Sequence, residues 1–408
     1  MSAELLGEIR PIAALGDAHG VLLAGPFGAE SYAAHLHRLG PLPVPPDLLE
    51  TIERADLRGR GGGAFPFARK VRSVLRMGAQ PLVVVNGGEG EPASRKDRLL
   101  LTTRPHLVLD GAAAAARLLG ADTAVVHLHA QNQQVVDAVR AALRERWATS
   151  DDPRWELSLG AGGYVAGESS AVIAQLEGAP ALPRWSPVPA AQSGYRGRPT
   201  LLSNAETYAQ VAVLARGLPW PSPFLVTVRG RLHPTVVEVV GSTTVGELLR
   251  EYGGVVAPPA AVLLGGYAGE WISGADAWRM PLEPRGCGLV AALPSGACGL
   301  AETARLARWM SEQGAGQCGP CYLGLPRLAD ALDRVLRGRR GALDDVERLL
   351  TAVDGRGACA HPDGVARLVR SALKTFRPEL AQHHKRHRKR CQLAGFPLAE
   401  ETLEAQVR

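Results

Sequence analysis

The sequence predicts an α/β domain built on a parallel sheet, followed by a small β-rich domain and a C-terminal helical bundle. Short apolar runs alternate with helical segments from about residue 80 to about residue 180, which is the pattern of parallel strands covered by helices. Short β-rich runs fill residues 222–290, and beyond Leu300 four segments space their apolar residues by three and four. These three observations place the domains at residues 1–220, 221–299 and 300–408.

Composition fits a multi-domain cytoplasmic protein. A chain of 408 residues with 46% hydrophobic and 21% charged residues can form several packed cores. No apolar run approaches the roughly 18–20 residues needed to cross a bilayer, and the N-terminus lacks a signal pattern. Six cysteines in a reducing compartment indicate metal binding or redox chemistry rather than disulfides. The net charge of +6 is only weak evidence for nucleic acid, and we expect none.

In the first domain, strands and helices alternate after a lead-in of about 50 residues. The expected strands are 82–85, 123–128 and 155–159, and the expected helices are 105–119 and 132–146. A further helix opens at the Gly167-Glu168-Ser169 segment, where Ser169 or Ser170 is a candidate cap. Residues 179–199 are rich in Pro, Gly and Arg, and we expect a long ordered loop there.

The rest of the chain supplies the β-rich domain and the bundle. Residues 221–299 hold the apolar runs LVTVRG, TVVEVVG and AVLLGG, with a short helix at Val245–Tyr252. Helices are expected at 304–310, 325–336, 343–353 and 365–376. The basic run His383–Arg390 is interpreted as the solvated end of a C-terminal helix, with docking to an acidic partner as the alternative.

A glycine-rich loop is the first candidate site. Residues 58–66 read RGRGGGAFP, and Lys70 follows. A loop with so little side-chain bulk can close its backbone N–H groups around an anion, and Arg58, Arg60 and Lys70 add positive charge. This is the chemistry of a phosphate cradle. A plain surface turn is the alternative, made weaker by the polar loops that follow the predicted strands.

Three of those loops carry side chains that suit a nucleotide. In Asn86–Arg98 (NGGEGEPASRKDR), Asn86 suits a heteroaromatic ring, while Glu89 and Glu91 suit sugar hydroxyls. A solvated charged turn explains this segment equally well. Glu168 follows the third strand and is a candidate ligand contact. In Ser203–Thr207, Ser203 and Glu206 have the spacing of a capping box, which is compatible with ligand binding by Asn204.

Three cysteines form a candidate metal site. Cys318 and Cys321 make a Cys-x-x-Cys pair between two predicted helices, and Cys359 precedes the last helix. Such pairs are typical of zinc and iron–sulfur sites. A tetrahedral site needs four ligands, so three cysteines leave the set incomplete. Unrelated thiols are the alternative.

These motifs, in this order, resemble the NADH-binding flavoprotein subunit of respiratory complex I and the related diaphorase subunits of hydrogenases and formate dehydrogenases. The likeness runs from about Leu57 to about Gly364. It implies an FMN-binding α/β domain, a ubiquitin-like β-domain of the soluble-ligand-binding type, and a bundle carrying a 4Fe–4S cluster. It further implies hydride transfer from NADH to FMN and one-electron transfer to the cluster. Other redox subunits or a ferredoxin-like protein are the implied partners, with a peripheral place on a membrane complex as one arrangement.

The resemblance also assigns roles to single residues. The catalytic assignments fall on Glu89 and Glu168. The cluster ligands fall on Cys318, Cys321 and Cys359. The cofactor contacts fall on Arg60, Gly61, Gly62, Gly63, Phe65, Lys70, Asn86, Glu89, Glu91, Tyr164, Gly167, Glu168 and Asn204.

Several positions depart from the family pattern. Ala315 replaces the first of the family's clustered cysteines, so the cluster takes another ligand, has three irons or is absent; Cys298 and His361 are the nearest substitutes in sequence. Ser73 and Val188 stand where the family has aromatics that stack on the dinucleotide, with Phe65 and Phe67 as candidate replacements. Gly88 stands where the family usually has aspartate. Two alternatives follow: an FMN protein that no longer uses NADH, or a redox-inactive scaffold subunit.

Overall fold

The computed structural model describes residues 12–15, 20–25, 28–147, 152–218, 220, 222–385 and 391–398. The chain divides into two compact units. The first comprises Met1–Gly90, Arg95–Val226 and Thr235–Thr243, and the second comprises Glu91–Ser94, Thr227–Pro234 and Thr244–Arg408. In the described part of the chain, no helix is both long enough and apolar enough to cross a membrane.

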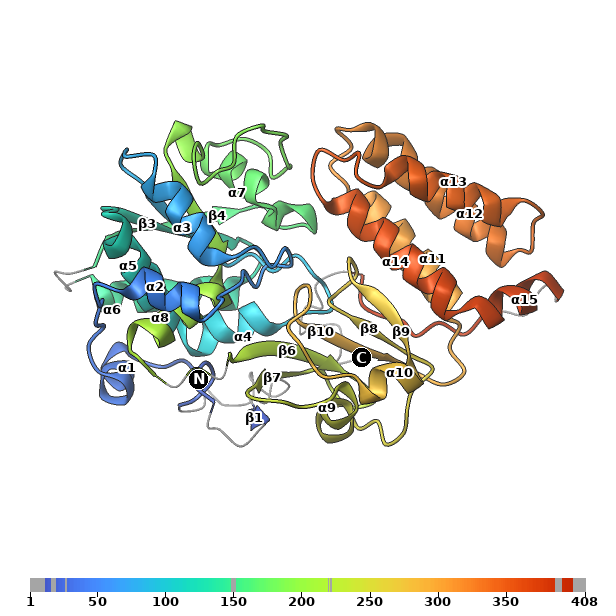
Figure 1. The fold of residues 1–408 in the computed structure, drawn as a ribbon, viewed down its shortest axis with the longest axis horizontal. Helices are drawn as coiled ribbons and strands as arrows, with labels where there is room; N and C mark the ends of the chain where they lie inside the picture. Colours follow the sequence, from blue (N-terminus) through green and yellow to red (C-terminus); the bar gives the residue numbers. More distant parts are fainter. Residues whose placement is uncertain are drawn as a thin grey trace. The chain divides into compact units, whose positions relative to one another are not determined.

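The first unit contains a four-stranded parallel sheet, which confirms the predicted α/β class (Figure 1). Its strands lie in the order β4-β3-β2-β5, and every neighbouring pair is parallel. The chain passes from β2 to β3 to β4 in one direction and then returns to place β5 on the other side of β2. The bounds are β2 Leu82–Asn86, β3 Thr123–His129, β4 Arg154–Gly160 and β5 Thr200–Asn204.

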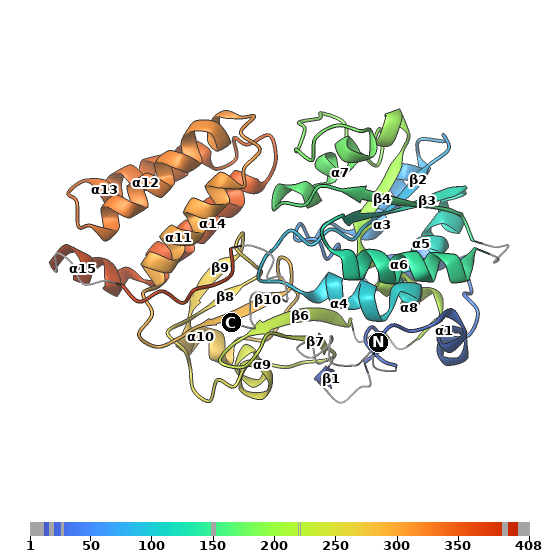
Figure 2. The same cartoon turned by 180° about the vertical axis from the view of Figure 1, so that it is seen from behind.

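Helices cover both faces of this sheet, as parallel strands require (Figure 2). Val83 and Val85 of β2 point into a large core shared with helices α5, α6 and α8. Leu82 and Val84 point the other way, into a smaller core with Val172 of α7. The helices of the unit are α1 Tyr32–Leu39, α2 Leu48–Arg54, α3 Phe67–Leu75, α4 Lys96–Thr103, α5 Pro105–Leu119, α6 Gln133–Arg146, α7 Ser169–Leu176 and α8 Ala205–Ala215, and strand β1 Ile12–Leu15 pairs in parallel with β7 Thr235–Val239.

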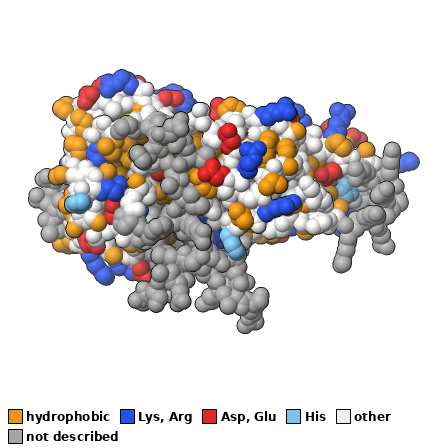
Figure 3. Space-filling view, turned by 90° about the horizontal axis from the view of Figure 1, so that it is seen from below, with side chains coloured by type: hydrophobic (Ala, Val, Ile, Leu, Met, Phe, Trp, Pro, Cys, Tyr) orange, Lys and Arg blue, Asp and Glu red, His pale blue; other side chains and the backbone are white. Residues whose placement is uncertain are grey.

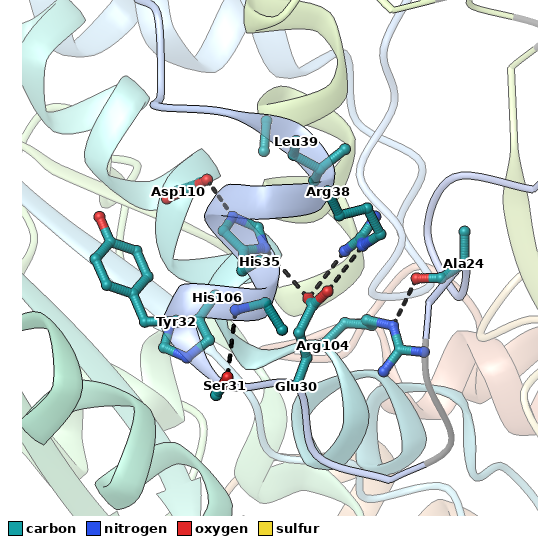
Figure 4. A network of polar contacts seen from close by, with 12 residues as sticks. Ala24, Glu30, Ser31, Tyr32, His35, Arg38, Leu39, Arg104, His106 and Asp110 are labelled. Atoms are coloured by element: carbon teal, nitrogen blue, oxygen red, sulfur yellow. Dashed lines mark hydrogen bonds and ion pairs between the residues drawn. The ribbon is translucent and has the colours of Figure 1, made fainter.

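A buried ionic network fastens α1 to α5 (Figure 4). The two ring nitrogens of His35 lie 3.2 Å from Glu30 and 2.7 Å from Asp110. Arg38 also binds Glu30, while Arg146 and Arg216 bind Asp110. Burial alone would raise the pKa of the Glu30 carboxyl, but the hydrogen bonds from His35 and Arg38 lower it to about 2. The network therefore holds the lead-in segment on the domain, a role that sequence patterns did not indicate.

The second unit contains β-strands and the helical bundle. Strand β10 Leu289–Leu293 is parallel to Thr227–Arg229 of β6 and antiparallel to β8 Ala261–Leu264, which pairs in turn with β9 Glu270–Ser273. Helix α9 Val245–Tyr252 agrees with the prediction, whereas α10 Gly274–Arg279 was not predicted. Strand β6 spans Phe224–Arg229. The division into three domains stays a prediction.

The bundle begins as predicted but has one more helix among the described residues. Its helices are α11 Gly299–Glu312, α12 Leu325–Leu336, α13 Ala342–Val353, α14 His361–Thr375 and α15 Arg377–Lys385. A short π-helical turn, Pro320–Gly324, contains Cys321 and leads directly into α12. The basic run predicted at 383–390 begins in the last turn of α15, and its residues 386–390 lie outside the described residues.

Candidate functional site

The predicted site lies where the strand order of the first unit reverses. Asn86 ends β2 and Asn204 ends β5, and the two are register partners in this parallel pair. Strands β3 and β5 lie on opposite sides of β2 in the sheet. The loops that follow β2 and β5 therefore diverge at this point. Open α/β sheets bind their ligands in the crevice at such a switch point. Both asparagines were predicted site residues.

The glycine-rich loop closes over the end of β5. Its ends form an isolated antiparallel bridge between Arg58 and Pro66, and the Gly59 amide donates to the Phe65 carbonyl at 2.9 Å. The Arg60 amide donates to the Thr207 hydroxyl at 3.0 Å, which fixes the loop to the first turn of α8. A side chain at Gly62 or Gly63 would meet no atom within 4 Å, and Gly62 has φ of +101°. The loop therefore presents bare backbone to open space.

Lys70 of α3 reaches the same place. Its Nζ donates to the carbonyl of Leu202, near the end of β5, at 2.8 Å. Burial lowers the pKa of this amine. Among the described residues, no carboxylate lies within 4 Å of the Lys70 ammonium. A partly buried cation without a counter-charge is costly, and a bound phosphate would supply that charge.

The Arg60 side chain turns away from the loop's open face. Its Nε donates to Gln210 at 3.2 Å and lies 3.9 Å from Glu206, and its guanidinium lies over the Phe224 ring. Burial lowers the pKa of Arg60, and Glu206 opposes that shift. Arg60 therefore contributes its backbone to the loop, while its charge is held inside the protein.

A buried polar layer supports the end of β5. The Lys96 ammonium lies 2.8 Å from Asp97 and 2.9 Å from Glu206. The Asn204 amide donates to Asp97 at 2.8 Å, and its carbonyl oxygen accepts the Glu206 amide at 3.0 Å. Asn204 therefore caps α8, and the predicted Ser203–Glu206 capping box is wrong. The only signal for Lys96 and Asp97 in the sequence was the KDR that follows NGGEGEP.

Asn86 and Glu89 organise the loop after β2. The Asn86 amide donates to the Gly167 carbonyl at 2.8 Å and its oxygen accepts the Gly88 amide at 3.2 Å. Glu89 is buried and accepts the Asp97 and Arg98 amides at 3.3 Å, at the start of α4. Glu91 belongs to the second unit, where it accepts the Tyr267 amide at 2.8 Å.

The loop after β4 meets the loop after β2. A side chain at Gly90 would lie 2.7 Å from the Gly163 carbonyl and 2.8 Å from the Tyr164 carbonyl, so these backbones touch. Glu168 accepts the Ser170 and Ala171 amides at 2.8 and 3.3 Å. Glu168 is thus the cap of α7, and the expected cap at Ser169 or Ser170 is wrong. The structure brings together the loops that carry the predicted contacts of the first unit.

The aromatic residues of the site differ from expectation. Phe67 is 1% exposed and packs edge-on against Tyr208, so the idea that it replaces a stacking aromatic is wrong. Phe65 is 50% exposed, with the Arg69 guanidinium 5.6 Å from its ring centre. Sequence reasoning missed Trp185, which is 71% exposed. Its neighbour Arg184 donates its amide to Ser170 at 2.8 Å, so Trp185 stands beside the Glu168 loop.

The three predicted cysteines of the bundle lie near one another. Burial, and then the neighbouring Cys318 and Cys359 thiols, raise the pKa of Cys321 to about 12. A side chain at Gly314 would lie 3.4 Å from the Cys321 sulfur, so the loop holding Ala315 passes beside it. The substitutes considered for the missing ligand are engaged otherwise. His361 lies 2.8 Å from the Met310 carbonyl, and Cys298 contacts Glu379 at 3.3 Å.

Comparison with known proteins agrees with this geometry. The Nuo51 FMN-binding domain matches residues 52–213, and the iron–sulfur binding region of NADH-ubiquinone oxidoreductase F matches residues 301–383. A solved chain of a NAD+-reducing [NiFe]-hydrogenase in the air-oxidized state is 30% identical, with a TM-score of 0.80 over 95% of this chain and 70% of that one. The chain belongs to the flavoprotein family that includes this hydrogenase chain and carries the Nuo51 FMN-binding domain.

Individual relatives extend over most of the chain. The second NADH-quinone oxidoreductase F subunit of Rhizobium meliloti is 29% identical over 83% of this chain and 89% of its own length. The corresponding F subunit of Rhodobacter capsulatus is 27% identical over 82% and 86%. The family resemblance found in the motifs is therefore confirmed, and with it an oxidoreductase that carries electrons through FMN and an iron–sulfur region.

The residues present fit both cofactors of the family, with one gap. The glycine loop and the Lys70 ammonium suit the phosphate of FMN. Three neighbouring thiols suit a cluster, whose fourth ligand position in the family pattern is Ala315.

Proposed function

We propose that this F-type subunit takes electrons from NADH onto FMN held at the β2–β5 switch point and passes them to an iron–sulfur centre held by Cys318, Cys321 and Cys359. The observation that carries the proposal is the partly buried Lys70 ammonium, which has a carbonyl partner and no carboxylate within 4 Å among the described residues, beside an open glycine loop. FMN, when bound, accepts a pair of electrons and hands them on singly.

Different residues bind the phosphate of the flavin, border its ring and position the ring-binding loops. Lys70 and the amides of Gly61, Gly62 and Gly63 bind the phosphate. Asn86, Gly167 and Tyr164 border the ring because their loops are joined by the Asn86–Gly167 hydrogen bond. Glu89, Glu168 and Asn204 use their side chains to cap α4, α7 and α8, so they position the ring-binding loops.

Phe65 and Trp185 are the proposed stacking aromatics for NADH. Both rings are largely exposed, on the loop over β5 and on the loop tied to α7. A stacked ring contributes about 0.5–1.5 kcal/mol, so these two residues offset the loss of aromatics at positions 73 and 188.

Rapid mixing of the flavin-loaded chain with NADH tests the proposal. We expect flavin reduction by NADH, and a KM for NADH about three- to tenfold higher in Phe65→Ala and in Trp185→Ala. Trp147→Ala is the matched control because Trp147 is an 84% exposed indole of the same unit at the end of α6. Flavin that dithionite reduces and NADH does not would refute NADH as the donor.

The second candidate is an FMN protein reduced by a ferredoxin-like protein. Ser73 and Val188 favour it: Ser73 accepts Gln192 at 3.4 Å and Val188 is half-exposed, and neither can stack on a ring. The same experiment decides, since reduced ferredoxin and no NADH would then reduce the flavin. Protein that binds neither flavin nor iron would support the scaffold alternative.

The names of the relatives indicate what kind of partner to expect. They are named as subunits, so we propose association with other redox subunits, with a ferredoxin-like protein as the electron partner. One face of the molecule intersperses acidic and basic side chains over its described residues, which favours short-range pairing over long-range steering (Figure 3). We also propose a cytoplasmic location, and recovery of the chain with its partners from the cytoplasmic fraction tests both proposals.

A further inference from the structure

A second group of metal-type ligands lies in the second unit, apart from the three predicted cluster cysteines. The thiols of Cys298 and Cys391 and the Nε2 of His383 all lie within 4.8 Å of one another. Cys298 is the N-cap of α11, His383 lies on α15, and Cys391 opens the segment 391–398. We propose that these three residues bind a single zinc ion.

The distances fit the edges of a tetrahedron around one ion. Zinc bonds of about 2.3 Å to sulfur and about 2.0–2.1 Å to nitrogen place S and N about 3.6 Å apart at the tetrahedral angle. The Nε2 of His383 lies 3.4 Å from the Cys298 sulfur and 3.7 Å from the Cys391 sulfur. In a 4Fe–4S cluster each thiolate binds a different iron, so the cysteine sulfurs stand farther apart than the 4.8 Å within which those of Cys298 and Cys391 lie.

Glu379 lies beside this group of three ligands. Its Oε2 lies 3.3 Å from the Cys298 sulfur. Its two oxygens also accept the Gly299 and Leu300 amides at 3.3 and 3.2 Å, which holds the carboxylate in place. Glu379 and His383 are four residues apart on α15, so their side chains project from the same face of the helix. Two thiols and an imidazole form a donor set that suits zinc.

The surrounding hydrogen bonds orient two of the ligands. The Nδ1 of His383 lies 3.1 Å from the Leu336 carbonyl, which can only accept a hydrogen bond, so Nδ1 carries the hydrogen. Nε2 is then the lone-pair nitrogen, and it faces both sulfurs. The Ala301 amide donates to the Cys298 sulfur at 3.4 Å, a contact that favours a thiolate.

The site would fasten the segment 391–398 to the bundle. That segment already lies along α11: the Gln392 carbonyl accepts the Cys298 amide at 2.8 Å, and the Phe396 amide donates to Glu302 at 3.0 Å. The family's iron–sulfur region matches residues 301–383, so Cys298 and Cys391 lie outside it. The two thiols of the zinc site are therefore different from those of the proposed cluster.

Metal analysis of the purified full-length chain tests the proposal. We expect one zinc ion per chain beside the iron, and loss of at least nine-tenths of it in both His383→Ala and Cys391→Ser, with flavin and iron unchanged. Cys287→Ser is the matched control because Cys287 is another half-buried cysteine of the same unit that forms no disulfide. Cys318→Ser must keep the zinc, which excludes zinc that has entered a vacated cluster site.

Cobalt substitution provides a readout that does not depend on how the variants fold. Chelator-treated and thiol-reduced protein should bind one Co²⁺ and develop tetrahedral thiolate–cobalt absorption to the red of the flavin bands, and zinc should displace it. Reduced protein that binds neither ion, or zinc that persists in Cys391→Ser and disappears in Cys318→Ser, would overturn the proposal and leave S–H···N hydrogen bonds to His383 as the explanation.

Discussion

At the switch point, the contacts of single side chains show which of them bind neighbouring backbone and which are available to a ligand. Asn204, Glu168 and Glu89 looked like direct ligand contacts in the sequence, and in the structure each caps a helix. Lys70 differs because its ammonium has a carbonyl partner and no carboxylate within 4 Å in the part of the chain that the structure describes. The strongest prediction at this scale therefore concerns Lys70.

Replacement of Lys70 by methionine should weaken FMN binding about 10- to 100-fold. A charge-assisted hydrogen bond to phosphate contributes about 1.5–3 kcal/mol, and methionine keeps the length of the side chain without the charge. Fluorescence titration of the flavin-free chain with FMN measures the change. Lys374→Met, on α14 of the second unit, is the control and should bind FMN normally. Unchanged affinity in Lys70→Met would remove Lys70 from the phosphate site.

The structure gives a steric reason for glycine at position 88 that the sequence did not reveal. A side chain there would begin 2.4 Å from the Nε2 of His129, at the end of β3. His129 is buried, so it occupies the room that the family's usual aspartate would need. Gly88→Asp should therefore lower stability by about 1–3 kcal/mol and reduce flavin retention.

The double variant Gly88→Asp/His129→Ala tests this explanation of Gly88. Removing the imidazole should restore flavin retention and most of the stability, measured as a thermal midpoint with the flavin content of each sample. If the double variant is no better than Gly88→Asp alone, crowding by His129 is not the reason for glycine at position 88.

At the scale of elements, the sequence predicted strands better than caps. Buried runs such as 82–85 have a simple pattern, and β2, β3 and β4 agree with their predictions to within two residues. Caps depend on which side chain reaches an amide in three dimensions, so Ser203 was chosen where Asn204 acts. Helix α15 was missed as a separate helix because only one residue, Phe376, divides it from α14.

Strand β3 carries an acid-sensitive residue. Burial, with a smaller effect of His129, lowers the pKa of His127 from its ordinary value to about 4. The unfolded chain then binds a proton that the folded strand does not, so stability is complete above about pH 6.5 and falls as the pH drops towards 4. The local free energy of opening should decrease by up to about 2 kcal/mol between about pH 7 and pH 5.

Hydrogen exchange of the β3 amides, corrected for intrinsic rates, measures that decrease. His127→Gln keeps a polar group near Ser158, 3.1 Å from His127 Nδ1, and cannot be protonated, so its pH dependence should be shallower by one proton. His37→Gln changes a histidine in the last turn of α1 and should leave the dependence as it is. An equally steep slope in His127→Gln would assign the acid sensitivity to other groups.

At the scale of the whole molecule, the order of motifs carried more information than any one of them. The glycine loop, the two asparagine loops and the cysteines are far apart in sequence, and together they indicated the family that the comparisons confirm. The pair Cys298 and Cys391 could not be found this way, because 92 intervening residues separate them and His383 lay in a run interpreted as solvated.

The remaining prediction concerns Ala315 and the completeness of the cluster. Cys318, Cys321 and Cys359 offer three thiolates, and a side chain at Gly314 would lie 3.4 Å from the Cys321 sulfur. A cysteine at position 315 would restore the family's fourth ligand, so Ala315→Cys should retain more iron and acid-labile sulfide than the natural chain after exposure to air. Ala358→Cys adds a thiol beside Cys359 without completing the motif and serves as the control. If the natural chain already holds four irons that resist air as well as those of Ala315→Cys, a ligand other than residue 315 completes the cluster.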